Sequence, residues 1–156
     1  GNISEGVNIG GVVGTLVQGI KGESSGTDVL VNIASFDWWD GEEVDSIRRY
    51  KKVLKTNVIS GKCTVHFQAT GNTSSRPGTY LCRCYVYKNN NQIGSTSLYV
   101  RDVGLDEEEE TTYKSIEINL SGSKGDKYEF RMDAEDRPTK AGIELGFKTT
   151  GVEIYN

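Results

Sequence analysis

The sequence is poor in the residues that usually carry catalysis, metal binding or covalent cross-linking. It holds 1 histidine, 3 cysteines, 2 prolines and 1 methionine among 156 residues. An odd and sparse set of cysteines argues against the disulfide framework of a small secreted scaffold. No apolar run approaches the about 18 residues of a membrane span, so we expect no membrane partner. We likewise expect no cofactor.

The charge balance is mildly acidic, with 18 basic and 22 acidic residues and a formal net charge of -4. Nucleic-acid-binding domains usually present a basic face on a basic chain, so this balance argues against a nucleic-acid partner. Hydrophobic residues make up 35% of the chain, which limits the core to one modest domain.

Glycine is abundant, at 19 residues, and several glycines interrupt short apolar pairs in residues 1–26. A segment of this kind has too few large side chains to build a core of its own. We therefore predict a glycine-rich arm over 1–26 that drives oligomerisation, and a folded domain over 27–156. The apolar side chains predicted to associate are Val7, Ile9, Val12, Val13, Leu16, Val17 and Ile20.

From Lys62 to the end of the chain, apolar and polar residues alternate in short runs, which is typical of strands with one buried face. Asn89-Asn90 and Ser123–Asp126 are the expected hairpin turns. Only 42–54 also fits a helix, and we favour a strand over about 48–59. About eight such strands predict an all-β fold, a jelly-roll-like β-sandwich of two packed sheets.

Cys63, His66, Cys82 and Cys84 offer three thiols and one imidazole, the ligands of a structural zinc site. Side chains alternate faces along a strand, so Cys63 and His66 should point to opposite sides of their sheet. The spacing thus favours buried, reduced thiols over a metal, and we predict no metal site.

Two exposed clusters are candidate sites. Trp38 and Trp39 stand between Asp37 and Asp40, and aromatic rings beside carboxylates can stack on sugars and bind their hydroxyls. The simpler interpretation is that one tryptophan plugs the edge of the core. The acidic run 106–110 could hold calcium, but it lacks the alternating spacing of a loop site and is better explained as a solvated loop, facing the lysines at 51, 52 and 55.

Several segments together form a recognisable order. A lysine-rich strand (50–55) precedes the hairpin strands of 86–97, then 115–132 with Gly125-Asp126, and a final strand in 142–156. A glycine-valine segment lies upstream. This order resembles the C-terminal β-sandwich of fibre and tail proteins in the virions of phages that infect Gram-positive bacteria. The aromatic cluster 36–39 and the acidic run 106–110 depart from that pattern.

The resemblance implies a non-enzymatic virion structural protein, located in the particle, assembling as a homotrimer with other virion proteins and contacting a host-surface glycan. The alternative is a carbohydrate-binding β-sandwich module that uses Trp38 and Trp39. Glycosidase action is a weaker alternative, because carboxylates such as Asp133, Glu135 and Asp136 are common in solvated loops.

Overall fold

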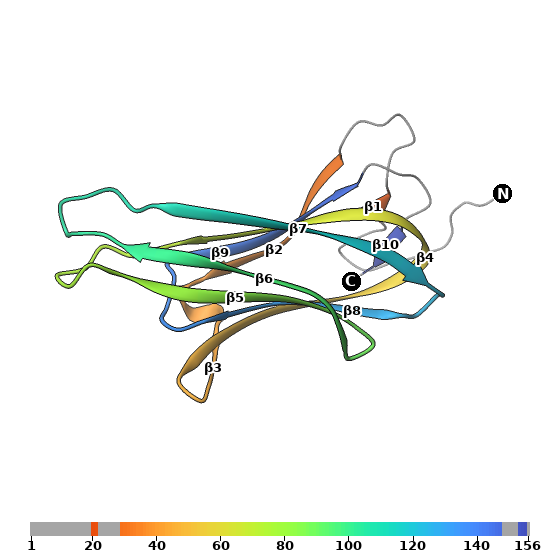
Figure 1. Ribbon diagram of the computed structural model, residues 1–156, viewed down its shortest axis with the longest axis horizontal. Coiled ribbons are helices and arrows are strands. Elements are labelled where there is room, and N and C mark those ends of the chain that lie inside the picture. Colours follow the sequence, from red (N-terminus) through yellow and green to blue (C-terminus); the bar gives the residue numbers. More distant parts are fainter. Residues whose placement is uncertain (1–19, 22–28, 148–152, 156) are drawn as a thin grey trace.

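In the computed structural model, the described residues are 20–21, 29–147 and 153–155. They form ten β-strands and one short 3-10 helix, η1 (Figure 1). The elements are β1 (Ile20–Lys21), β2 (Val29–Asp37), η1 (Trp38–Asp40), β3 (Glu42–Val44), β4 (Ile47–Thr70), β5 (Gly78–Lys88), β6 (Asn91–Asp102), β7 (Thr111–Gly122), β8 (Lys127–Ala134), β9 (Lys140–Phe147) and β10 (Glu153–Tyr155).

The strands form two antiparallel sheets that pack face to face, which confirms the predicted all-β, jelly-roll-like sandwich at the level of its layers. Sheet A contains β3, β4, β8, β5 and β6, with β10 and β1 at its margin. Sheet B has the order β2-β9-β4-β7. In Figure 1, β7 lies in the upper layer and β5 and β8 in the lower layer.

The 24-residue strand β4 belongs to both sheets. Its first half pairs with β8 in sheet A, and its second half pairs with β7 and β9 in sheet B. Figure 1 shows β4 curving from one layer to the other at one end of the molecule. Gly61, with φ 140°, lies near the start of the half that pairs with β7, opposite Leu120, and glycine permits there a backbone conformation that other residues rarely adopt. The predicted break between two separate strands near 60 is thus wrong: a bend replaces it.

The segment 42–54 forms a hairpin of β3 and β4 and no helix, as we predicted for its second half. Its turn residues Asp45 and Ser46 have φ 51° and 68°. Asn89 and Asn90 make an equivalent turn, with φ 48° and 72°, between β5 and β6. Two successive positive φ values give the turn twist that matches paired strands, which explains why asparagine and aspartate stand there.

The inward faces of both sheets share one core. The alternation predicts that Tyr80, Cys82, Cys84 and Val86 of β5 and Tyr128, Phe130 and Met132 of β8 point inward, and all are buried except Tyr80, which is partly buried. The largest fully buried side chains come from both sheets. These are Tyr50, Tyr128, Phe67, Phe130, Leu54, Leu120, Met132, Ile143, Leu145 and Val65. The same alternation directs the residues between them to the two outer faces of the sandwich.

Candidate functional site on sheet B

The outward side chains of sheet B form a grid of rows that cross all four strands. The register places Asp37, Lys140, Thr70 and Thr111 in one row. Ser35, Gly142, Gln68 and Tyr113 form the next row. A third row holds Asn32, Glu144, His66 and Ser115, and a fourth holds Leu30, Gly146, Thr64 and Glu117. Polar side chains dominate this face, in contrast to the apolar core beneath it.

A shallow depression of about 420 Å³ covers the first two rows. Most of its lining residues are outward residues of these two rows, and two inward residues, Phe36 and Ala141, also contribute. The lining residues are Ser35, Phe36, Asp37, Gln68, Thr70, Thr111, Tyr113, Lys140 and Ala141. Gly142 of the second row lies beneath the side chain of Gln68, whose Nε2 would be 2.9 Å from a Cβ atom at this position.

The depression combines two aromatic residues, Phe36 and Tyr113, with several hydrogen-bonding groups. Tyr113 is 68% exposed and therefore accessible to a ligand. Thr70 and Thr111 share a hydrogen bond of 2.7 Å between their hydroxyls. Asp37 and Lys140 add an acceptor and a donor in register across β2 and β9. Such a set can stack on a sugar ring and bind its hydroxyl groups.

The structure brings one predicted site residue, Asp37, into the depression. Asp40 lies in η1, where its carboxylate accepts a hydrogen bond of 2.7 Å from the backbone N–H of Asp37. Trp38 is half-buried, with the guanidinium of Arg137 5.6 Å from its ring centre. Trp39 is 80% exposed, two residues after Asp37. The four residues therefore form a short turn at the end of β2, in which the exposed Trp39 ring lies edge-on to the Trp38 ring, with 6.3 Å between the ring centres.

The predicted arm lies mostly outside the described residues: Val7, Ile9, Val12, Val13, Leu16 and Val17 have no described structure. Ile20 is described, and its backbone pairs with Ile154 of β10 in the same chain. The last part of the segment predicted as an arm is thus joined to the margin of sheet A.

The sulfur residues lie inside the sandwich. Cys63, Cys82 and Cys84 are buried free thiols, and His66 lies on the outer face of sheet B, 2.6 Å from the hydroxyl of Ser115. Cys63 and His66 thus lie on opposite faces of their sheet, as predicted. Burial raises the pKa of the Cys63 thiol to about 12, so it stays protonated at neutral pH. Among the residues described, no group of three or more potential metal ligands gathers.

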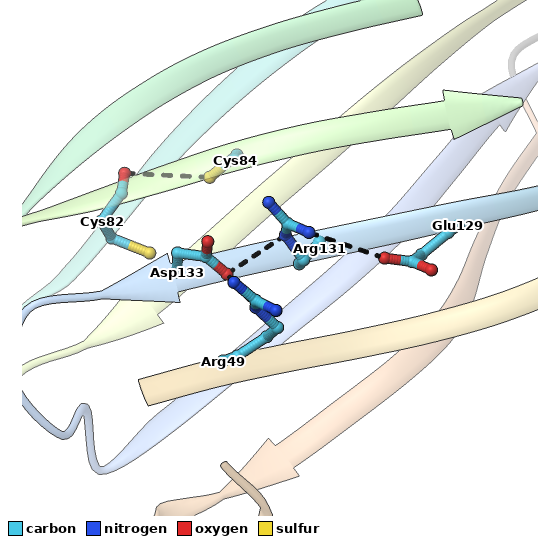
Figure 2. Close-up of polar contacts among 6 residues, drawn as sticks. All are labelled: Arg49, Cys82, Cys84, Glu129, Arg131 and Asp133. Atoms are coloured by element: carbon cyan, nitrogen blue, oxygen red, sulfur yellow. Dashed lines mark hydrogen bonds and ion pairs between the residues drawn. The ribbon is translucent and has the colours of Figure 1, made fainter. Parts of the chain in front are cut away.

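The outward face of sheet A holds a network of charges (Figure 2). Asp133 lies between two arginines, with its Oδ1 3.2 Å from Arg49 Nε and 3.3 Å from Arg131 Nε. Glu129 lies 4.0 Å from the other side of Arg131. The guanidinium of Arg131 is also 4.8 Å and 4.9 Å from the ring centres of Tyr85 and Tyr87. The charged groups of this network thus have partners within the protein.

The acidic run does not face the lysines that we predicted. Its last residue, Glu110, forms an ion pair of 2.8 Å with Arg101 of β6, and Glu109 accepts a hydrogen bond from Thr139. Lys51, Lys52 and Lys55 lie on the half of β4 that pairs with β8. The exposed run lies in the connection from β6 to β7, and its last two residues contact Thr139 and Arg101.

Sequence reasoning missed Tyr113, Gln68 and Lys140. Two signals pointed to them: the outward positions of 62–68 and 111–120, and the alternation of charged residues with Gly142 and Gly146 along β9. Neither signal shows which strands lie side by side, so the rows emerge only from the register.

Comparisons with known proteins leave the chain without a family. No family model matches it, and no curated protein gives a significant match. Among solved structures, it is similar to part of the crystal structure of dimeric latent PorU from Porphyromonas gingivalis, with a TM-score of 0.36 and 15% identity. The alignment covers 90% of this chain and 14% of that chain. The likeness is too weak to support any statement on function.

Within the described residues, no helix has the length and apolar character of a membrane span.

Proposed function

We propose that this chain is a non-enzymatic recognition domain of a virion fibre or tail, and that it binds carbohydrate of the host surface through the depression on sheet B. The observation that carries the binding proposal is the depression itself, with the exposed ring of Tyr113 beside hydroxyl, amide, carboxylate and ammonium groups. Sugar-binding sites need this combination, because a sugar ring has an apolar face and a polar rim.

The spacing of carboxylates on this face supports binding without hydrolysis. Asp37 is in register with Lys140, and Glu144 lies four residues farther along β9. At ~3.3 Å per residue the two positions are about 13 Å apart along the strand. Paired catalytic carboxyl groups of glycosidases are about 5 to 9.5 Å apart. The backbone positions of these two carboxylates are therefore farther apart than the paired carboxyl groups of glycosidases.

The virion setting rests on the order of hairpins and on the glycine-valine segment that precedes them. In that setting the chain assembles with itself, as a homotrimer, and with other virion proteins through the arm. A free-standing carbohydrate-binding module is the second candidate, and the same depression favours it. The two candidate functions predict different oligomeric states but the same binding face.

Binding can be tested by screening the purified chain on an array of bacterial surface glycans and measuring Kd for the best ligand. We expect Tyr113→Ala to weaken binding at least about tenfold, the effect of losing about 1.4 kcal/mol of contact energy. Tyr99→Ala is the matched control, because Tyr99 is 63% exposed but lies on the outer face of sheet A. Equal Kd values for both variants and the parent would reject the proposed site.

Assembly can be tested by removing residues 1–19, which keeps the pairing of Ile20 and Lys21 with β10. We expect the full chain to elute as a trimer and the shortened chain as a folded monomer, measured by light scattering. A full chain that is already monomeric would favour the free-standing module over the fibre or tail component.

A further inference from the structure

The strand β6 forms one margin of sheet A. It pairs with β5, and among the described residues no strand pairs with its other side. Just beyond its end, Val103 donates a backbone hydrogen bond of 2.9 Å to Asn72 and accepts one of 2.7 Å from Ser74. In an antiparallel sheet, every second residue of an edge strand directs its N–H and C=O groups away from the sheet. The length of β6 before Val103 can therefore accept a further strand.

Three other margins of the sandwich carry features that protect a strand edge. β2 has a bulge, marked by a register shift between Asn32 and Ala34. β3 has only 3 residues and includes two glutamates. On β7, Lys114 stands opposite the buried Phe67, at a position on the core side of the strand, and yet it is exposed. Bulges, short strands and charges at inward positions are devices that prevent pairing along an edge.

β6 has none of these features over 94–100. Its register with β5 is unbroken there, and the residues include no charge and no proline. A Cβ atom at Gly94 would lie 3.2 Å from Ile116 Cδ1 of β7. Ile116 packs against the core but is only partly buried, at the side where β6 and β7 meet. A strand added to β6 would thus extend sheet A and cover this side of the core.

The segment 6–19 of the predicted arm has the composition of such a strand. It contains no charged residue, so it would bring no charge to the uncharged edge of β6. Most of its larger side chains are β-branched, which favours strands. These are Val7, Ile9, Val12, Val13, Thr15 and Val17. Alternation along an extended chain would place Val12 on one face of the segment and Val13 on the other.

The arm joins the domain at the margin of sheet A opposite β6. It leads into β1, and the order across the sheet is β1-β10-β4-β8-β5-β6. Five steps of ~4.8 Å separate β1 from β6 by about 24 Å. To reach β6 of its own chain, the uncharged arm would have to cross sheet A, whose outer face carries the charges of Arg49, Arg131 and Asp133. The β6 strand of a second copy requires no such crossing.

From these observations we propose that residues 6–19 of one copy add a strand to the β6 edge of the next copy. Strand addition to an exposed sheet edge is a common mode of peptide recognition. Donor and acceptor lie at opposite margins of the domain, so the contact is head-to-tail, and three such contacts close a ring. The inference rests on the proposed function, since it names the surface that the arm binds in the trimer.

The test uses the full chain, with its mass measured by light scattering and its fold checked by circular dichroism. Thr96→Lys places on the inward side of β6 the kind of lysine that Lys114 supplies on β7, and we expect a folded monomer in place of the parent trimer. Thr112→Lys is the matched control. It adds a lysine to the inward side of β7, an edge that Lys114 already protects, and the trimer should persist.

A second variant blocks the donor and leaves β6 intact. This arm variant combines Val12→Lys with Val13→Lys, which puts a lysine on each face of the segment, and it should also be monomeric. Mixed in equal amounts, Thr96→Lys supplies a free arm and the arm variant supplies a free β6 edge. We expect the mixture to form a dimer with one copy of each, which neither variant forms alone.

Hydrogen exchange gives a measurement that does not depend on the folding of Thr96→Lys. Backbone amides of an unpaired edge exchange readily, whereas an added strand protects those that it binds. Within 94–100, we expect the slowest-exchanging amides of the parent to include some that exchange at least about tenfold faster in the arm variant.

The outcomes separate the two proposals. If the parent is a trimer, a trimer that persists in folded Thr96→Lys, a mixture without the dimer, or equal exchange in 94–100 overturns the inference and leaves assembly through the arm standing. A monomeric parent whose 94–100 amides are protected by the arm means that the arm pairs within its own chain, which overturns the inference and the proposed trimer. A monomeric parent without this protection overturns both as well.

Discussion

The two outer faces of the sandwich arise from the same alternation of side chains but use their polar groups differently. On sheet A, Asp133 and Glu129 lie close to arginines, and Arg131 is stacked against two tyrosine rings. On sheet B, the charged residues are spread over several rows, and a depression covers the first two of these rows. Internal pairing leaves the first face little capacity for ligand, whereas the second keeps donors, acceptors and a ring available.

The largest expected effect concerns the core that lies under both faces. Phe130 is fully buried in sheet A, and Phe130→Ala should lower the free energy of unfolding by about 3–5 kcal/mol. Because β4 belongs to both sheets, we expect one unfolding transition, with tryptophan fluorescence and circular dichroism changing together in denaturant. Separate transitions for the two probes would mean that the faces are independent units.

A smaller loss of stability should distinguish the two faces directly. Asp133→Asn removes the charge that faces Arg49 and Arg131 and should cost about 1–2 kcal/mol, because the side chains of this network are largely covered. The matched change on sheet B is Glu117→Gln, whose partner Lys62 is 3.9 Å away and equally exposed. Denaturant unfolding should show a change within about 0.5 kcal/mol for that variant. Equal losses for both variants would contradict the contrast drawn between the faces.

Acid should weaken the contact between two hairpin turns, because Asp126 of the β7–β8 turn accepts a hydrogen bond of 3.1 Å from the side chain of Asn89 in the β5–β6 turn. The backbone N–H of Ser123, which also donates to this carboxylate, is the main cause of its lowered pKa, followed by Asn89. A lowered pKa means that the ionised form stabilises the fold. The contribution is complete above the ordinary value of 3.8 and is lost as the pH falls below it through the folded-state pKa.

Unfolding curves of the parent and of Asp126→Asn, recorded from neutral pH down to pH about 2.5, should therefore converge as the pH falls. A difference between the two proteins that stays constant over this range would show that the carboxylate charge plays no part.

The smallest effect on stability is expected at the proposed binding residue. The side chain of Tyr113 is 68% exposed, so Tyr113→Ala should change the free energy of unfolding by no more than about 0.5 kcal/mol. Its loss of glycan binding would then be a property of the face and not of a weakened fold. If Tyr113→Ala lost as much stability as Asp133→Asn, its weaker glycan binding could not be separated from a weakened fold.

Much of the fold could be predicted from the sequence, because period-two alternation determines which residues of β5, β7 and β8 point inward. Asn89-Asn90 marks its turn by the backbone conformation that asparagine tolerates. The continuity of β4 was missed, since Gly61 reads equally well as the end of a strand or as a bend. The pairing of Gly142 with Gln68 and Ser35 joins residues far apart in the chain, and no local pattern contains that information. Asp37 was found because it adjoins an aromatic pair, whereas Tyr113 stands alone in an ordinary polar strand.

The pairing of β1 with β10 has a mechanical consequence. Ile20 pairs with Ile154, and Lys21 with Glu153, in antiparallel register. A pull applied between the chain preceding Ile20 and the chain following Tyr155 loads this pair from one end, so its hydrogen bonds would break one after another and not all at once. The margin of sheet A would therefore open under low force, and the next strand to bear the load would be β4, which is anchored in both layers.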